Sequence, residues 1–259
     1  MKSIVLILAA AVLLAACGQP VATATPTLPP AVTGVTLTYG EAAQVELVTP
    51  SGRHIYIDIA NTAALQSEPT ADDVLLTTHL HGDHYYSSFV ESFPGQQLFT
   101  SEGRIELPDV TITGLASAHN SGDPIQAEGA TNYIYIIETG GLRIAHFGDI
   151  GQDALTPEQL AALGSVDLAI TQLANSFSSM SADNLKGFNL IEQIRPRLIL
   201  PTHSDRATIE IAVGRWPGYY GESTTVSLAP EKLPAGTGVL VLGNLAAAYG
   251  SLYGLEIWK

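Results

Sequence analysis

The sequence predicts an α+β fold in which β-sheets are packed with helices on their outer faces. Short β-rich runs separated by turn signals fill much of the first half of the chain. The second half changes rhythm and alternates apolar strand-like runs with helix patterns. No internal repeat of fixed period is visible. Sheets with helices outside them fit this order better than a helix bundle or a sandwich of strands alone.

The predicted strands follow one of two patterns. Residues 54–59 alternate, with Ile55, Ile57 and Ile59 on one face. Others are continuous apolar runs typical of buried strands, such as "DVLLTTH" and "RLILPTH". The segment "ETGGL" predicts a hairpin turn. In chain order the predicted strands cover residues 35–39, 44–48, 54–59, 73–79, 97–100, 110–115, 133–138, 142–147, 166–173, 197–203, 239–242 and 252–258.

Three helices are predicted from their end signals. The first follows "THLHGDHY", carries Phe89 and stops before Pro94. The second lies in "TPEQLAALG", where Thr156 is the N-cap and Gln159 completes a capping box. The third covers residues 181–195, has apolar residues at helical spacing, and ends before a proline.

The first 17 residues have the pattern of an export signal. They contain Lys2, an apolar run over residues 4–16, and then Cys17, which is the only cysteine of the chain. The apolar run is too short to span a bilayer as a helix. The end "LAAC" is similar to a bacterial lipobox, in which the cysteine is lipidated; the alternative is an ordinary signal cleaved at an Ala-x-Ala site. We therefore expect an exported protein that is anchored to a membrane through a lipid on Cys17.

Composition divides the rest of the chain and narrows its partners. Residues 18–34 are rich in Pro, Thr and Ala and carry no charge, which predicts an extended linker. Residues 35–259 fit one domain. The chain has 11 Lys and Arg against 25 Asp and Glu, a formal charge of −14, and no basic run. A nucleic-acid partner is therefore not expected. The oligomeric state cannot be predicted from the sequence.

The strongest chemical signal is "THLHGDHY", directly after a buried apolar strand. It places His79, His81, Asp83 and His84 close together in a chain with seven histidines. His79 and His81 can point the same way from an extended segment, whereas Asp83 and His84 diverge. A random His-x-His-x-Asp-His is expected in about one of 5,000 such chains. One short loop is thus predicted to supply ligands to two cations, the alternative being a hydrogen-bonded loop or a surface histidine tract.

Three further motifs each follow a predicted strand: "SAHNSG" with His119, "HFGDIG" with Asp149 and "LPTHSD" with His203. Together with "THLHGDHY" they resemble, in order, the ligand motifs of the metallo-β-lactamase superfamily of metal-dependent hydrolases. The segments "NYIYIIETGGLRIAHFGDIG" and "LTPEQLAALGSVDLAI" resemble the branch of ascorbate-phosphate lactonases and N-acylphosphatidylethanolamine-type phosphodiesterases. The resemblance implies a four-layered αββα sandwich.

The resemblance also implies a role for each motif residue. It assigns His79, His81 and His119 to a first metal. It assigns Asp83, His84 and His203 to a second metal, and the carboxylate of Asp149 to both. These ligand types suit two zinc ions, with manganese or iron as alternatives. A bound water with a pKa near ~7 is a nucleophile at neutral pH. Asp83 would hold or relay the proton of that water and is the expected catalytic residue.

Two departures from the family narrow the expected reaction. Many zinc β-lactamases have a cysteine where Asp149 stands, which disfavours a β-lactam substrate. The diiron oxygen reductases have a glutamate in place of His81, so hydrolysis is favoured over redox chemistry. We expect hydrolysis of an ester, lactone or phosphodiester in a small-molecule or lipid-like substrate. The alternatives are a binding lipoprotein that holds metal only for stability and, third, an exported nuclease.

Three further residues near these motifs also have predicted roles. His146 alternates with apolar residues and is expected in the core or behind a metal ligand. Asp58 is expected either to support a ligand or to be a solvated loop residue. His54 is expected to be an exposed strand residue.

The pocket wall is the least predictable part. Tyr85 and Tyr86 are expected either to line the pocket or to pack beside it. Ser204 and Asp205 are expected either to contact substrate or to cap the next helix. The branch often has a glycine-rich turn after "VDLAI", whereas this chain has "TQLANSFSSM". The wall near Asn175 is therefore expected to be specific to this protein.

Overall fold

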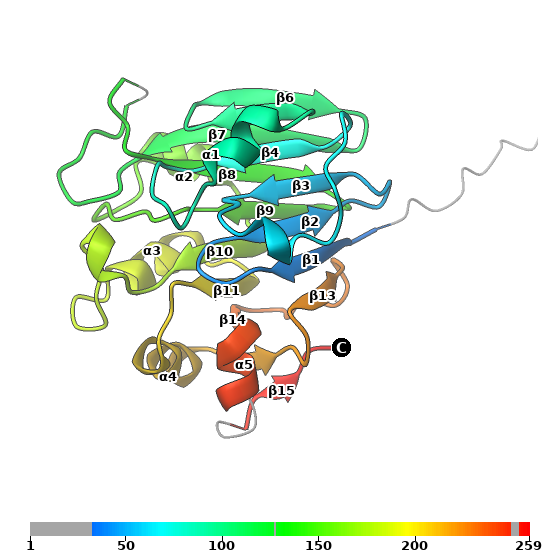
Figure 1. Cartoon of the computed structure of the whole chain (residues 1–259). Coiled ribbons are helices and arrows are strands. Elements are labelled where there is room, and N and C mark those ends of the chain that lie inside the picture. The colour runs from blue at the N-terminus through cyan, green and yellow to red at the C-terminus, as the bar shows by residue number, and fades with distance from the viewer. Residues whose placement is uncertain (1–32, 127, 250–253) are drawn as a thin grey trace, which may run out of the picture. The chain divides into compact units, whose positions relative to one another are not determined.

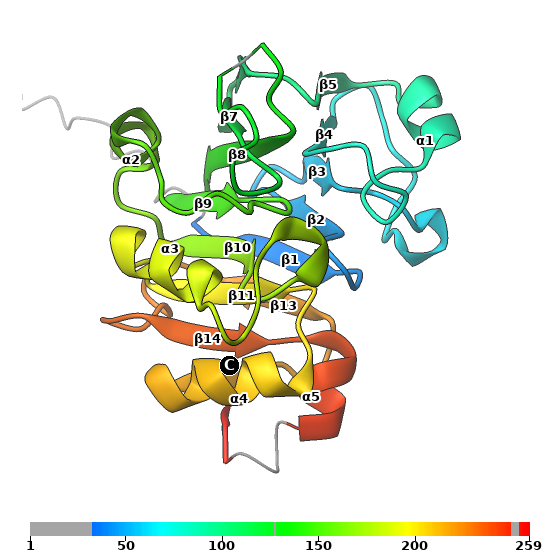
Figure 2. The same ribbon diagram turned by 90° about the vertical axis from the view of Figure 1, so that its left-hand side faces the viewer.

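The computed structural model describes residues 33–126, 128–249 and 254–259. The predicted signal with Cys17 and residues 18–32 of the predicted linker lie outside the described residues. Two β-sheets are stacked face to face, and helices cover their outer faces (Figures 1 and 2). The predicted four-layered αββα order is confirmed. No helix in the described ranges is long and apolar enough to cross a bilayer.

The first sheet has six strands in the order β13-β1-β2-β3-β4-β5. The pairs from β13 to β3 are antiparallel, whereas β3, β4 and β5 run parallel. Its strands are β1 (Val35–Tyr39), β2 (Val45–Val48), β3 (His54–Ile57), β4 (Val74–Thr77), β5 (Gln96–Phe99) and β13 (Thr225–Leu228).

The second sheet has nine strands in the order β15-β12-β14-β11-β10-β9-β8-β7-β6. Strands β6 to β9 form an antiparallel meander, and the strands from β9 to β15 in that order run parallel. They are β6 (Gly103–Leu107), β7 (Val110–Ser117), β8 (Asn132–Thr139), β9 (Leu142–His146), β10 (Leu168–Gln172), β11 (Leu198–Thr202), β12 (Gly218–Tyr220), β14 (Gly238–Val241) and β15 (Glu256–Ile257).

Five α-helices and two short 3₁₀ turns occur in the described ranges: α1 (Ser87–Ser92), α2 (Pro157–Leu163), α3 (Lys186–Ile194), α4 (Arg206–Arg215), α5 (Gly243–Tyr249), η1 (Thr62–Ala64) and η2 (Ser176–Ser178). The predicted capping box of α2 is present, with the Thr156 hydroxyl accepting from the Gln159 N–H at 3.1 Å and Gln159 Oε1 accepting from the Thr156 N–H at 3.0 Å. Strands β6, β12 and β13 and helix α5 had not been predicted, and α4 had been expected only as the helix to be capped by Ser204 or Asp205.

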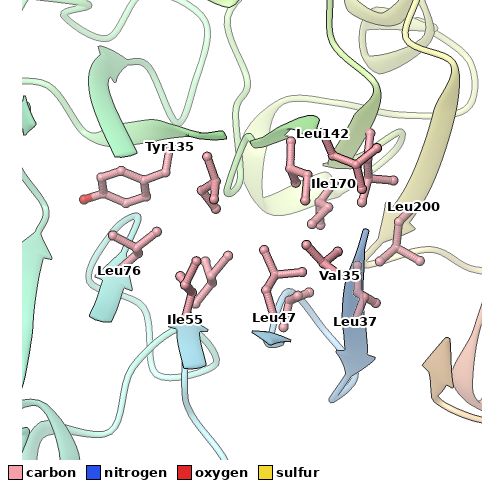
Figure 3. Close-up of a cluster of buried hydrophobic side chains, with 14 of the residues drawn as sticks. Val35, Leu37, Leu47, Ile55, Leu76, Tyr135, Leu142, Ile170 and Leu200 are labelled. Atoms are coloured by element: carbon pink, nitrogen blue, oxygen red, sulfur yellow. The ribbon is translucent and has the colours of Figure 1, made fainter. Parts of the chain in front are cut away.

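Apolar side chains fill three separate interfaces between the layers. The largest cluster lies between the sheets, where Leu47 and Ile55 of the first sheet face Ile170 and Leu200 of the second (Figure 3). A second cluster lies between the nine-stranded sheet and the helices and includes Phe188 of α3. A third packs α1 on the other sheet. Because both faces of each sheet are covered, central strands such as β4, β10 and β11 are buried along their whole length.

Several predicted elements differ from the structure at an end, and for two of them the difference has a clear local cause. The helix predicted from residue 181 begins at Lys186, because the side chains of Ser181 and Asn184 bond each other's backbone N–H groups in a turn. The strand predicted to reach Ile59 ends at Ile57, because Asp58 adopts a left-handed φ of 52°. Ile59 consequently packs with α1 and lies on the face opposite Ile57.

The direction of the strands determines where loops with polar residues gather. β7 is antiparallel to β8, and β8 to β9, so β7 runs the same way as the parallel strands β9, β10 and β11. Their carboxyl ends lie at one edge of the sandwich, beside the carboxyl ends of β3 and β4 (Figure 2). The start of β1 lies at the opposite edge, where the Gly34 N–H donates to the Gly140 carbonyl in the β8–β9 turn.

Candidate metal centre

All seven residues predicted as metal ligands lie together at the carboxyl ends of the strands. β4 leads into the segment that carries four of them, and β7, β9 and β11 lead into one each. Candidate ligand atoms lie within 4.8 Å of one another in two groups, which are His79, His81, His119 and Asp149 in the first, and Asp83, His84 and His203 in the second. The sequence motifs therefore converge in space as predicted.

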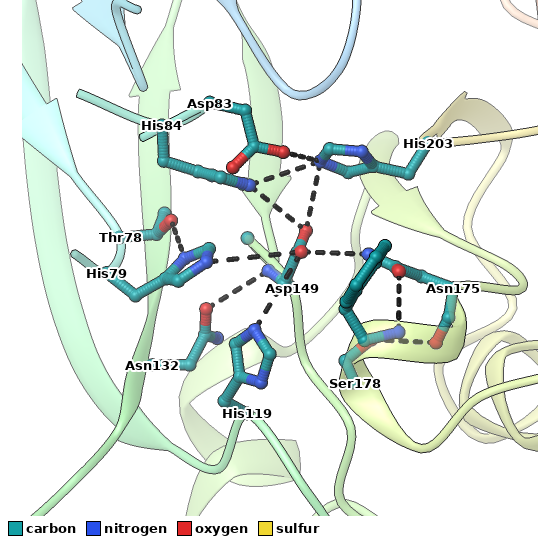
Figure 4. A network of polar contacts seen from close by, with 12 residues as sticks. Thr78, His79, Asp83, His84, His119, Asn132, Asp149, Asn175, Ser178 and His203 are labelled. Carbon is teal, nitrogen blue, oxygen red and sulfur yellow. Dashed lines mark hydrogen bonds and ion pairs between the residues drawn. The ribbon is translucent and has the colours of Figure 1, made fainter. Parts of the chain in front are cut away.

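Asp149 connects the two groups through its two carboxylate oxygens (Figure 4). Its Oδ2 lies 4.0 Å from Nε2 of His79 and 3.9 Å from Nε2 of His119. Its Oδ1 lies 3.4 Å from Nε2 of His84 and 3.3 Å from Nε2 of His203. Each oxygen thus faces its own pair of imidazole nitrogens, which is the arrangement expected of a carboxylate placed between two cations.

The remaining two members lie on the solvent side of the cluster. The His81 ring centroid is 4.6 Å from the ring centroids of both His79 and His119, and its side chain is exposed. Asp83 Oδ2 lies 4.0 Å from His203 Nε2, and 56% of the Asp83 side chain is accessible. A substrate would therefore approach the cluster from the side of His81 and Asp83.

Hydrogen bonds on the far side of three imidazoles turn their Nε2 atoms inward. His84 Nδ1 donates to Asp58 Oδ2 at 2.8 Å. His79 Nδ1 lies 3.1 Å from the Thr78 hydroxyl, which donates onward to Asp58 Oδ2 at 2.7 Å. His119 Nδ1 contacts the Asn120 side-chain amide at 3.0 Å. The carboxylate and hydroxyl partners of His84 and His79 are of the kind that orient a metal-binding imidazole and raise its basicity. The partner of His119 is the amide nitrogen of Asn120, a donor group, so it contributes to the position of the ring only.

Asp58 holds ligands on both sides of the centre from behind. It is completely buried, and its Oδ1 also accepts the Thr78 N–H at 2.8 Å. Of the two roles considered for Asp58 from the sequence, its surroundings therefore fit support of a metal ligand. Its complete burial excludes a solvated loop residue. Two residues here, Asp58 and His203, have left-handed φ values of 52° and 45°. This conformation costs about 1–2 kcal/mol for a residue with a Cβ, so both residues carry local backbone strain.

Burial and neighbouring charges shift the pKa values within the cluster. Burial, with the nearby His84 charge, lowers the pKa of His79 to about 3, and burial also lowers the pKa of His119. Burial opposes protonation of His84 too, but the Asp58 and Asp149 carboxylates outweigh it and raise the pKa to about 10. Burial opposes ionisation of Asp149, yet hydrogen bonding and charge from His84 lower the pKa to about 2. The side chain of Asp149 is therefore ionised, and the imidazoles of His79 and His119 are uncharged, so that each has a nitrogen lone pair that could bind a cation.

Buried polar atoms without hydrogen-bond partners mark the same place. In the described ranges these atoms are His79 Nε2, His119 Nε2, Asp149 Oδ1, Gln172 Oε1 and Thr202 Oγ1, the last two at the carboxyl ends of β10 and β11. A buried polar atom without a partner is costly and uncommon. Three of the five are potential ligand atoms aimed at a shared space. Neutral imidazoles and an ionised carboxylate in that arrangement fit divalent cations such as zinc.

The backbone around Asp149 requires close approaches that explain the glycines of "HFGDIG". Gly148 has φ of +55°, and a Cβ there would lie 2.4 Å from Asn132 Oδ1. Asn132 Oδ1 accepts the Asp149 N–H at 3.1 Å, so this close approach positions the bridging residue. At Gly151 a Cβ would lie 2.0 Å from the His119 carbonyl oxygen. Only glycine fits either position.

Asn132 and Asn175 both bond to Asp149, and the motifs did not identify either of them as a site residue. Asn132 also donates to Ser117 Oγ at 2.7 Å and to the Phe147 carbonyl at 2.8 Å. Asn175 Nδ2 donates to Asp149 Oδ2 at 2.9 Å, so the segment "TQLANSFSSM" contacts the carboxylate of Asp149 directly. The unusual "TQLANSFSSM" was the only sequence signal for Asn175. Asn132 gave no signal, because its partners are distant along the chain.

The other candidate residues lie outside the cluster. His146 is buried, and its Nε2 donates to the Ala43 carbonyl at 3.0 Å. The prediction that His54 is exposed was wrong, because its Nδ1 lies 2.6 Å from Glu46 Oε1, which is buried. Tyr85 packs edge-on against Phe99.

Two of the pocket-wall expectations can now be decided. Tyr86 faces a different hollow, near η1, and does not line the cavity beside the cluster. Asp205 is the N-cap of α4, where it accepts the Thr208 N–H at 2.8 Å, and it also lines the cavity. Ser204 bonds back to the Thr202 carbonyl at 3.0 Å.

Comparison with known proteins agrees with this geometry. The family model described as the β-lactamase superfamily domain matches residues 36–203. A UPF0173 metal-dependent hydrolase of Thermococcus onnurineus is 27% identical over 164 residues, which cover 54% of this chain and 70% of that protein. One from Thermus thermophilus is 26% identical over 180 residues, covering 61% of this chain and 78% of the relative.

Among solved structures, a Zn-dependent hydrolase of the metallo-β-lactamase superfamily from Thermotoga maritima has a TM-score of 0.59 at 17% identity. The match covers 81% of this chain and all of that protein. The metallo-β-lactamase fold protein YhfI of Bacillus subtilis has a TM-score of 0.51 at 12% identity, and the match covers 80% of this chain and 96% of YhfI. At these identities the similarity establishes the shared fold.

Proposed function

The chain belongs to the β-lactamase superfamily of metal-dependent hydrolases, and from this premise we propose that it binds two divalent cations and hydrolyses an ester, a lactone or a phosphodiester. The proposal rests on the way the two carboxylate oxygens of Asp149 face different pairs of imidazoles. Its Oδ2 faces His79 and His119, and its Oδ1 faces His84 and His203. A single cation would need only one of these sets. Structural zinc sites are closed by four ligands, whereas seven His and Asp ligands leave positions open for chemistry.

The chain's own residues perform three tasks in this proposal. His79, His81 and His119 would hold one cation, Asp83, His84 and His203 would hold the other, and Asp149 would serve both. Asp58 and Asn132 hold His84 and Asp149 in position through hydrogen bonds on the side away from the cavity. When bound, the cations lower the pKa of a water to about 7 and stabilise developing negative charge.

Asp83 is the proposed proton carrier. Its carboxylate lies at the edge of the cluster next to His203 and is more than half accessible, so it can take a proton at its Oδ atoms and release it to solvent. No cysteine stands at position 149, which keeps a β-lactam outside the proposed substrates.

Metal analysis and an activity panel test the proposal together. Purified protein should contain about two zinc, manganese or iron ions per chain by mass spectrometry. It should hydrolyse at least one of a chromogenic phosphodiester, ester and lactone. Chelator should abolish turnover, and added metal should restore it. A protein that binds metal yet cleaves none of the panel would favour a metal-stabilised binding lipoprotein, and digestion of RNA or DNA would favour a nuclease.

We also propose that the protein is exported and held at a membrane by a lipid on Cys17. The support is the sequence of residues 1–17 and the uncharged Pro/Thr/Ala-rich segment after it. In a bacterial host the wild type should incorporate labelled fatty acid and fractionate with membranes. Cys17→Ser should do neither while the domain stays folded. Unchanged fatty-acid labelling of Cys17→Ser would contradict the proposal.

A further inference from the structure

A cavity of about 790 Å³ opens beside the cluster, on the side of the second group of ligands. Its wall includes His81, Asp83, Asp149 and His203. The opposite wall is the segment of residues 174–182, which departs from the family branch. The cavity is therefore continuous with the proposed catalytic centre and is the space available to the part of a substrate that does not react.

The charged side chains that line this cavity include acidic residues but no Lys or Arg among those described. Three carboxylates line it, from Asp83, Asp149 and Asp205. Lys186, which follows the segment, is paired with Asp153 and Ser121. A substrate tail that carries negative charge would have no counter-charge away from the cations. Phosphoryl groups are usually clamped by Arg or Lys as well as by metal, and that clamp is missing from the described wall.

Apolar side chains at the mouth complete the pattern. Phe177 is 80% exposed and Leu80 is 56% exposed, and both line this cavity. Met180 and Ala174 add further apolar surface to the lining of this cavity. Large apolar side chains that are exposed together at a cavity mouth are characteristic of a binding surface rather than of ordinary protein surface.

The Phe177 segment is held in place from below. Asn175 Oδ1 accepts the Phe177 N–H at 3.0 Å, while Asn175 Nδ2 donates to Asp149. The Ser178 hydroxyl is buried and accepts from Gln172 Nε2. The Met180 N–H donates to the Asn175 carbonyl at 3.2 Å. Phe177 is therefore presented at the mouth by a segment that is anchored to the bridging carboxylate.

We infer that Leu80 and Phe177 flank a subsite for an uncharged apolar acyl group, so that the substrate is a carboxylic ester or lactone with a hydrocarbon tail. This inference rests on the proposed hydrolase function and names its substrate class. The cluster receives the carbonyl, and the tail lies between Phe177 and Leu80 over Met180. The carboxylates of the cavity disfavour a tail that ends in a negative charge.

Two pairs of p-nitrophenyl esters test the subsite on the metal-loaded protein. From acetate to hexanoate we expect kcat/KM to rise about tenfold, because a mouth that covers only part of the chain gains less than full burial of each methylene. The adipate monoester has the length of hexanoate and a terminal carboxylate, and it should react about tenfold more slowly than hexanoate. Phe177→Ser and Leu80→Ser should each reduce the hexanoate-to-acetate ratio to about two.

Ile257→Ser is the matched control, since Ile257 is an exposed apolar residue on β15 and does not line this cavity. It should leave the ratio unchanged. A ratio that stays at the wild-type value in both Phe177→Ser and Leu80→Ser would overturn the subsite. Faster turnover of bis(p-nitrophenyl) phosphate than of the hexanoate ester would overturn the substrate class.

Calorimetric binding of hexanamide and acetamide separates this inference from the proposed function. If the protein hydrolyses no phosphodiester, ester or lactone of the panel, the hydrolase proposal fails, but the subsite still predicts tighter binding of hexanamide. That preference should be lost in Phe177→Ser and kept in Ile257→Ser. Equal binding of the two amides to the wild type would overturn the subsite regardless of any activity.

Discussion

The two ends of strands β9, β10 and β11 carry similar kinds of residue with opposite consequences. At the amino ends, Arg143 bonds Glu138 and, through its backbone N–H, Asp167 Oδ2 at 2.9 Å. Arg197 lies 3.5 Å from the other oxygen of Asp167. At the carboxyl ends, Asp149 and His203 face one another and further imidazoles, with no Lys or Arg among the described cluster residues.

This difference separates groups that stabilise the fold from groups that serve chemistry. At the amino ends each carboxylate has a guanidinium partner, so charge is balanced within the protein and nothing else is needed. At the carboxyl ends the lone pairs of several neutral imidazoles and a carboxylate point at a common space. A cluster of neutral imidazoles around a carboxylate, in which only His84 has a raised pKa, is suited to a cation supplied from outside that displaces the His84 proton.

The largest expected effect follows from removing the residue that joins both ligand groups. Asp149→Ala should reduce kcat/KM by more than ~100-fold, because even residues behind metal ligands are worth about 10- to 100-fold. His81→Ala, on the exposed side, should lose activity with little change in unfolding temperature. Metal content and turnover are measured side by side. Full activity of either variant would show that the carboxyl-end cluster is not the active centre.

Replacing the carboxylate behind the ligands should have a smaller effect. Asp58→Asn keeps an oxygen for the Thr78 N–H but removes an acceptor for His84 Nδ1. We expect metal affinity to fall about 10- to 100-fold, with activity recovered at high metal concentration. Titration with a competing chelator measures this. Unaltered affinity would mean that His84 is oriented by its packing alone.

A weaker effect is expected for the hydrogen bond from the segment above the centre. Asn175→Ala removes the donor to Asp149 Oδ2 and one cap of η2. Loss of one charge-assisted bond of about 1.5 kcal/mol should lower kcat roughly tenfold. Metal content should stay close to that of the wild type. A large loss of metal would instead make Asn175 part of the support for the ligands.

The smallest effect on activity, and the sharpest contrast, is expected at the other end of the sandwich. Asp109 accepts from Arg53 Nε at 2.9 Å and Thr49 Oγ1 at 2.6 Å. Although burial acts against it, these bonds and that of Ser51 lower the pKa of Asp109 from 3.8 to about 2. Asp109→Asn should leave turnover unchanged and lower the free energy of unfolding by about 1 kcal/mol at pH 7.

The pH dependence of that difference follows from the direction of the shift. A carboxyl whose folded pKa is lowered contributes stability that is present above its ordinary pKa and lost as pH falls through the folded value. The gap between wild type and Asp109→Asn should therefore narrow as pH falls from about 4 toward 2. Urea unfolding at several pH values measures it. A gap that is constant with pH would rule out ionisation of Asp109 as its source.

The sequence was informative wherever the signal was local. Residues 79–84 lie on one loop, and His119, Asp149 and His203 each follow a strand, so strand direction alone brings them to one edge. The capping box of α2 is likewise contained in four residues. These features depend on neighbours along the chain, which is why spacing predicted them.

The supporting residues could not be predicted in the same way. Asp58 has a role because β3 lies beside β4, and Asn132 because β8 lies between β7 and β9. The pairing of His54 with Glu46 depends on the register of β2 and β3. Ile59 changes face because a single residue takes a left-handed φ. Each of these depends on strand order or on one backbone angle, which residue type alone does not determine.

The hydrogen bond between Gly34 and Gly140 has a practical consequence for handling the protein. It places the start of β1 at the edge of the sandwich remote from the cavity. A bead, sensor chip or fusion partner joined ahead of Gly34 would attach at the edge opposite the cavity. The opening of the cavity between Leu80 and Phe177 would then face the solution. Immobilised protein should consequently react with dissolved esters as fast as free protein does.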